Sequence, residues 1–309
     1  MTLLETPVPA AAPARPTSPS ARDARWGWAQ SMVMLIAVIG VGILVYPMAA
    51  SWSAALKHDT DVDGYTRTID SIPSEELDER VAEAREYNAS LPSDLLRDPY
   101  ALGADGQQTA VGEGSDAYFA QLTVPGTDAM GRVRIPAIDL DLPIFHGTDE
   151  ATLARGVGHL YGSALPVGGV GTHSVLAGHN GYVQATLFDD IDELQEGDSI
   201  VVSTMGEDLY YEVDQTQIVL PDQSDALRPE PGHDYLTLVT CTPTGVNTHR
   251  LLVRAERVAA PTGEQTRSVI ADDADAAGFP WWAIILVGVP TVAFFAVTPR
   301  RRRAVPSQS

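Results

Sequence analysis

The sequence predicts an all-β domain, a barrel or a sandwich, carried between two membrane-spanning helices. Short runs of alternating or apolar residues follow one another from residue 131 to 258, and Gly, Pro, Asn and Asp separate them. Seven or eight such strands are typical of a barrel or sandwich. Helical patterns inside this region are few and short, and the best candidates are residues 149–157 and 185–194. Two uncharged apolar runs, one on each side, predict the membrane helices.

The strands are expected at residues 132–138, 140–145, 172–178, 199–205, 208–220, 235–241 and 249–258. Before them, Leu77, Val81, Ala84 and Tyr87 form an apolar stripe at helical spacing, so a stalk helix is predicted just after Pro73. Residues 97–116 follow as a loop with four glycines and one proline. This loop precedes the β-domain and is not part of it.

The two apolar runs cover residues 26–56 and 276–299 and hold no charged side chain. A helix needs about 20 residues to cross a bilayer, so spans are expected at 29–50 and 279–298. Two alternatives stay open. The small residues at 48–55 would suit cleavage of a signal peptide, and the second run would also suit a buried core helix.

Basic residues orient both spans. Three arginines precede the first span and residues 300–303 are all arginine, and such residues stay on the cytoplasmic side. Both termini are therefore expected in the cytoplasm, with the β-domain outside the cell membrane. The predicted segments are a disordered tail (1–28), a span (29–50), an outer helical segment (51–117), the β-domain (118–260), an acidic linker (261–278), a span (279–298) and a basic tail (299–309).

The chain is strongly acidic, with 41 Asp and Glu against 20 Lys and Arg and a net charge of −21. All but Glu5 and Asp23 of these acidic residues lie between the two spans. Such a surface repels nucleic acid and anionic lipid, so nucleic acid is excluded as a partner. Solubility in an anionic exterior accounts for the charge.

Cys241 is the only cysteine, so an internal disulfide is excluded. It follows the apolar run Leu236–Thr240, and Pro243 lacks a backbone donor, so the strand is expected to stop near the thiol. Strand ends hold a side chain rigidly beside loops that admit substrate. A thiol has a pKa of about 8.5 and needs a base or a cation to act as a nucleophile. A buried, inert thiol is the alternative.

His179 and Arg250 are the candidate partners of the thiol. His179 sits between glycines after the apolar run 174–177, so it also caps a strand. Arg250 opens the run after Cys241, and its donor fork suits a developing oxyanion. His249 precedes it and must face the other side of the strand. Neither metal-ligand spacing nor a phosphate loop is visible, so no metal and no cofactor is expected, and the acidic stretch 188–198 would bind calcium weakly at best.

The segments "LVTCTPTGVNTHRLLVRAERV", "SVLAGHNG" and "GRVRIPAIDLDLPIFHGT" with "GVGHLYGSALPVGG" together resemble a sortase, and class C, the pilin-polymerising group, is the nearest subgroup. The resemblance implies a closed, eight-stranded β-barrel. It also implies Cys241 as nucleophile, His179 as general acid and base and Arg250 as oxyanion stabiliser, with Thr240, Asn180 and Asn247 in support.

Class C sortases carry an N-terminal lid with an Asp-Pro-aromatic motif, and "RDPY" offers Asp98, Pro99 and Tyr100. The lid is expected to place Asp98 near Arg250 and Tyr100 over the thiol. Two departures stand out: Tyr100 replaces the usual Trp or Phe, and Asn180 replaces a frequent Arg. Class C sortases also often carry a C-terminal span.

The resemblance implies a transpeptidase that cleaves an LPxTG-like signal after its threonine and passes the acyl group to a pilin lysine. A housekeeping sortase, which would use a peptidoglycan amine as acceptor, remains an alternative. A non-enzymatic surface anchor with an inert thiol and a cysteine protease that releases the acid to water are further alternatives.

Overall fold

The computed structural model of the 309-residue chain describes residues 27–92, 98–100, 115–261 and 278–298. The predicted tails, most of the acidic linker and the glycine-rich loop after Tyr100 lie outside the described residues. The chain divides into two units. One comprises residues 1–42 and 286–309, and the other comprises residues 43–285.

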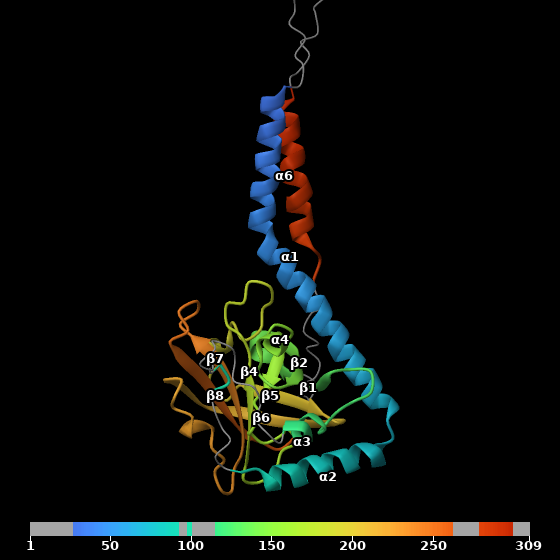
Figure 1. The fold of residues 1–309 in the computed structure, drawn as a ribbon, viewed down its shortest axis with the longest axis vertical. Helices are drawn as coiled ribbons and strands as arrows, with labels where there is room; N and C mark the ends of the chain where they lie inside the picture. Colours follow the sequence, from blue (N-terminus) through green and yellow to red (C-terminus); the bar gives the residue numbers. More distant parts are fainter. Residues whose placement is uncertain (1–26, 93–97, 101–114, 262–277, 299–309) are drawn as a thin grey trace, which may run out of the picture. The chain divides into compact units, whose positions relative to one another are not determined.

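Eight strands close into a barrel in the order β1-β2-β3-β4-β7-β8-β6-β5 (Figure 1). Their bounds are β1 Ala129–Ile135, β2 Leu140–His146, β3 Val157–His159, β4 Thr172–Ala177, β5 Ser199–Thr204, β6 Glu207–Val219, β7 Asp234–Thr242 and β8 His249–Arg257. The predicted closed, eight-stranded barrel is therefore confirmed. The sequence pattern missed β3, because three residues are too few to show alternation.

The directions of β4, β7 and β8 bring one end of each strand to the same end of the barrel. β4 and β7 pair in parallel, so their carboxyl ends lie at the same end of the barrel. β8 runs antiparallel to β7 and therefore begins where β7 finishes. The end of β7 at Thr242 agrees with the stop expected from Pro243. Inside the barrel the strands bury large apolar side chains completely, among them Ile135, Ile144, Leu176, Ile200 and Leu238.

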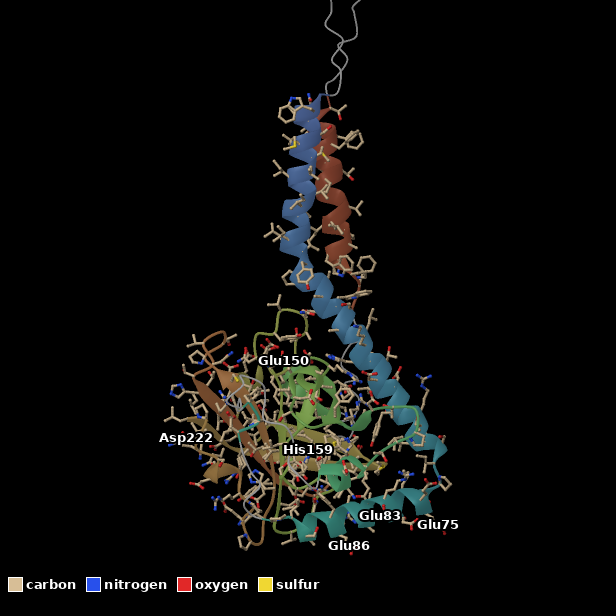
Figure 2. The ribbon with its side chains drawn as sticks, viewed as in Figure 1. Glu75, Glu83, Glu86, Glu150, His159 and Asp222 are labelled. Atoms are coloured by element: carbon tan, nitrogen blue, oxygen red, sulfur yellow. The ribbon has the colours of Figure 1, made fainter. Side chains whose placement is uncertain are left out.

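Two long helices precede the barrel: α1 (Trp28–Ser71) and α2 (Ser74–Ser90). Within α2, Val81 and Ala84 are buried, and Leu77 and Tyr87 pack against the core, so the predicted apolar stripe is confirmed. Glu75, Glu83 and Glu86 lie on the exposed side of the same helix (Figure 2).

α2 is fastened to the β3–β4 connection, and the short α3 (Ser115–Phe119) is fastened to the end of β3. The Asn88 amide donates to the carbonyl of Leu165 at 3.1 Å and accepts from its N–H at 2.7 Å. In α3, the buried Tyr118 hydroxyl donates to the carbonyl of His159 at 2.9 Å. Both helices are thus held to the barrel by buried or half-buried hydrogen bonds.

Of the described helices, α1 alone is long and apolar enough to cross a membrane. It runs on without a break to Ser71, past the boundary at residue 50 that was expected between the span and the stalk. α6 (Trp281–Val297) is apolar and has 17 residues, which is short for a span.

Of the two short helices that the sequence predicts, one forms and the other does not. Residues 149–157 hold α4 (Glu150–Leu153), which is shorter than expected. The helix expected at 185–194 is wrong, because only the 3-10 turn η2 (Ile191–Glu193) forms there. The Asp189 carboxylate accepts from the N–H groups of Gly181 and Leu187, each at 2.7 Å, and these local bonds replace those of a helix.

Candidate active site

Cys241 and Arg250 face each other across the β7–β8 ladder, where they are direct register partners. Directly opposed side chains on neighbouring strands lie within about 4.5–5.5 Å at their Cβ atoms. Both are buried, each with 8% of its surface exposed. The only thiol of the chain therefore lies beside a guanidinium at a strand end, as the sequence predicts.

His179 reaches the same end of the barrel from β4. The β4–β7 ladder pairs Ala177 with Val239, so His179 and Cys241 each lie two residues beyond a paired position. Between them, the Thr240 hydroxyl donates to the carbonyl of Gly178 at 2.7 Å and ties the two strand ends together. The structure therefore brings the three predicted catalytic residues to one place.

Gly178, the residue before His179, packs closely against Phe188. A Cβ atom on Gly178 would lie 2.7 Å from the Phe188 ring, so the ring packs directly on the backbone. The N–H of Phe188 donates to the carbonyl of His179 at 2.9 Å. No other residue fits position 178 without moving the loop that follows His179.

Asp98 reaches Arg250 as the lid motif predicts. Its two carboxylate oxygens accept from Nε and Nη2 of Arg250 at 2.9 and 2.8 Å. The two side chains are 8% and 9% exposed, so the pair is almost dry. Such a two-pronged contact uses the donors that a developing oxyanion would need. Pro99, the second residue of the motif, is buried.

Tyr100 fills the space beside the catalytic candidates. Its hydroxyl donates to a carbonyl, either that of Gly178 at 2.6 Å or that of Val239 at 3.0 Å. Its ring lies 5.0 Å from the Arg250 guanidinium and 6.1 Å from the His179 ring. The ring also packs on a small apolar cluster comprising Leu160, Val175, Leu227, Val239 and Leu252.

The electrostatics of this arrangement favour a neutral site. Burial raises the pKa of the Cys241 thiol, while Arg250 lowers it and Asp98 raises it. Burial also lowers the pKa of His179, against the smaller opposing influences of Glu150 and Asp189. Both shifts favour the uncharged thiol and imidazole and disfavour the reactive ion pair.

The supporting residues take the following places. The Asn180 side-chain oxygen accepts from the Thr244 hydroxyl at 3.0 Å, which joins the β4 and β7 loops. Asn247 adopts the left-handed region at φ 59°, and its carbonyl accepts from Nη1 of Arg250 at 3.2 Å. Among the described residues, no cluster of His, Cys, Asp and Glu is arranged to hold a metal ion.

Sequence reasoning missed two neighbours of His179. The Tyr182 ring stacks on the imidazole at 5.2 Å between centroids, and Glu150 places a carboxylate oxygen 3.6 Å from Nε2. Tyr182 follows the histidine closely but falls in a loop without periodicity. Glu150 comes from α4, far away in the chain, so no local pattern connects it with the histidine.

Comparison with known proteins identifies the family. Residues 133–258 match the sortase domain. A crystal structure of sortase C-1 from Actinomyces oris is 45% identical, with a TM-score of 0.56 over 60% of this chain and 99% of that one. The pilus-related sortase C of Group B Streptococcus is 38% identical, with a TM-score of 0.58 over 64% of this chain and 97% of that one.

Among the curated relatives, Sortase A of Bacillus anthracis is 30% identical over 142 residues. These residues make up 46% of this chain and 66% of that relative, so the match spans just under two thirds of its length. The chain belongs to the sortase family, and class C sortases are among its structural neighbours.

Proposed function

We propose that the protein is a cysteine transpeptidase that cleaves an LPxTG-like sorting signal and joins it to the lysine amine of a pilin. The observation that carries the proposal is the meeting of Cys241, Arg250 and His179 at one end of a sortase barrel. A thiol, a cation and a base within reach of one another are what thioacyl chemistry requires. An inert surface anchor would need none of these at a strand end.

The first half-reaction forms a thioester. Cys241 Sγ attacks the threonine carbonyl carbon, and its proton passes to His179. Arg250 donates hydrogen bonds to the tetrahedral oxyanion, whose collapse breaks the C–N bond to glycine. His179 returns the proton to the leaving amine.

The second half-reaction transfers the acyl group. A neutral lysine amine attacks the thioester carbonyl and gives up a proton to His179. The C–S bond breaks, the thiolate takes the proton back, and an isopeptide bond remains. The reaction consumes no oxidant or cofactor. Attack by water in place of the amine would hydrolyse the thioester and release the acid, which is the protease reaction.

Asp98, Pro99 and Tyr100 serve in this proposal as a lid that must leave before substrate binds. Two contacts support this role. Asp98 occupies the Arg250 donors, and Tyr100 lies beside Arg250 and His179 over an apolar cluster. The resting enzyme is therefore proposed to keep its cation neutralised and its thiol protonated.

We further propose that the protein sits in the cell membrane with two spans, α1 and α6, and both termini in the cytoplasm. The apolar length of α1 supports the first span. The Trp52 indole donates to the carbonyl of Gly278 at 2.7 Å and contacts the Trp282 ring, and both indoles suit a membrane–water interface. Reaction of single added cysteines at Ser20 and Ser307 with an impermeant reagent tests the topology: in intact cells neither would react.

The acceptor distinguishes this proposal from a housekeeping role in wall anchoring. Class C neighbours and the Asp98 contact favour the pilin lysine, whereas the relationship to Sortase A of Bacillus anthracis favours a peptidoglycan amine. The test gives the full-length enzyme an LPxTG-type peptide together with a pilin-type lysine peptide and a peptidoglycan stem peptide in equal amounts. Mass spectrometry of the products decides: a dominant lysine isopeptide supports pilus assembly, and a dominant stem-peptide product supports wall anchoring.

A further inference from the structure

The proposed mechanism does not say which nitrogen of the His179 imidazole exchanges the proton. Nε2 is buried and lacks a hydrogen-bond partner among the described residues. The nearest acidic group is the Glu150 carboxylate, with Oε2 at 3.6 Å. This separation is slightly longer than a hydrogen bond, and catalytic hydrogen bonds are often long before substrate binds.

The backbone that carries Glu150 is held firmly. Asp149 caps α4 by accepting from the Thr152 N–H at 2.9 Å. Leu153, at the other end of this single turn, is fully buried in the barrel domain. The Thr152 hydroxyl donates to the carbonyl of His146 at 3.4 Å. Glu150, labelled in Figure 2, therefore projects from a backbone turn that its neighbours hold in place.

Among the groups around the imidazole, Glu150 is the acidic side chain that can change its contact with the ring. Tyr182 stacks on the imidazole, and Tyr100 lies 6.1 Å away in a tilted arrangement. The Asp189 carboxylate also acts on the ring but is committed to two backbone N–H groups. The thiol of Cys241 and the Asp98–Arg250 pair are the other titratable groups at this end of the barrel.

We propose that Glu150 is the positioning residue of His179: it accepts a hydrogen bond from Nε2–H and so leaves Nδ1 to exchange the proton with Cys241 and the leaving amine. A carboxylate that orients a catalytic imidazole fixes its tautomer and stabilises the imidazolium. This inference rests on the proposed transpeptidase function. Because the Glu150 side chain is 71% exposed, solvent screens the contact and its effect on rate is modest, about twofold to fivefold.

The sign of the effect follows from the charge. Glu150 raises the pKa of His179 against the larger lowering caused by burial, so removal of its charge lowers that pKa further. The imidazole is then a weaker base towards the thiol proton, and the imidazolium formed during the reaction is less stabilised. Because the resting site holds an uncharged imidazole and an uncharged thiol, the acidic limb of kcat/KM against pH is expected to move to lower pH.

The test compares Glu150→Gln with Asp149→Asn in the full-length protein in detergent micelles. Asn caps a helix as well as Asp does, so the control removes the same charge one residue away and keeps α4 intact. NMR titration of 13C-labelled histidine, with His179→Gln to assign the signal among the seven histidines, gives the imidazole pKa without any need for activity. The pH profile of peptide cleavage is measured in parallel.

We expect a lower His179 pKa and a twofold to fivefold lower kcat/KM at neutral pH for Glu150→Gln, and wild-type values for Asp149→Asn. Glu150→Asp would recover part of the loss. An unchanged His179 pKa in Glu150→Gln, or an equal shift in Asp149→Asn, would overturn the inference. If the NMR shift occurs but the wild-type protein forms no acyl-enzyme, the contact stands and the proposed function fails instead.

Discussion

Replacement of Asp98 by alanine tests whether the Asp98–Arg250 pair holds the lid over the candidate active site. The change removes both hydrogen bonds to Arg250 and leaves the barrel untouched. If the lid is held by this pair, the balance shifts from the closed towards the open arrangement. Cys241, the only cysteine, then reacts faster with a small alkylating reagent such as iodoacetamide.

The magnitude follows from the geometry. Each hydrogen bond to a charged partner contributes about 1.5–3 kcal/mol. Part of this is recovered when the open groups are rehydrated, so a net loss of about 2–3 kcal/mol is a reasonable expectation for the almost dry pair. At about 1.4 kcal/mol per factor of ten, the alkylation rate of Cys241 rises about 30- to 140-fold.

The chain offers a matched control on the same strand. Arg254 and Asp214 form an equivalent two-pronged pair, at 3.1 and 2.7 Å, with both partners outside the candidate site. Asp214→Ala removes a pair of the same kind and should leave the alkylation rate of Cys241 unchanged. A rate for Asp98→Ala no higher than that of Asp214→Ala would refute the idea that this ion pair holds the lid.

Three further predictions follow from the site. Arg250→Lys keeps the charge but loses the donor fork, so kcat for peptide cleavage should fall about 100-fold or more in steady-state assays, and wild-type kcat would contradict the oxyanion role. Because burial raises the Cys241 pKa and Asp98 adds to that increase, the pH midpoint of its alkylation should lie above that of a free thiol and move down in Asp98→Ala; an upward move would contradict this. Gly178→Ala forces a Cβ against Phe188 and should destabilise the protein by about 1–3 kcal/mol in thermal unfolding, whereas Gly64→Ala, with open space around it, should not.

The strand pattern predicts an all-β domain, a barrel or a sandwich, and it places the three catalytic candidates at strand ends, because these features depend on local pattern. The closed, eight-stranded barrel is implied by the resemblance to sortases. The run before Cys241 shows strand alternation, and Pro243 marks where the strand stops. Arg250 is then placed opposite the thiol by a hairpin register that a short connection permits. These features are readable without knowledge of the rest of the fold.

The parts that failed or were missed depend on contacts between distant segments. The helix expected at residues 185–194 has the right composition, but Asp189 bonds to the backbone of a loop that wraps around His179. Glu150 approaches His179 only because α4, which lies in the crossover between the parallel strands β2 and β3, comes close to the end of β4. The anchoring of α2 through Asn88 to Leu165 likewise has no local signature.

Acylation of Cys241 by a sorting signal can be read from the intact mass of the protein after incubation with an LPxTG-type peptide. The full-length chain is used as wild type and with Asp98 and Tyr100 both replaced by alanine. We expect an acyl adduct that accumulates faster in the double variant and disappears when Cys241→Ala is added. Ready alkylation of Cys241 in the double variant, without any acyl adduct from a panel of such peptides, would contradict this expectation.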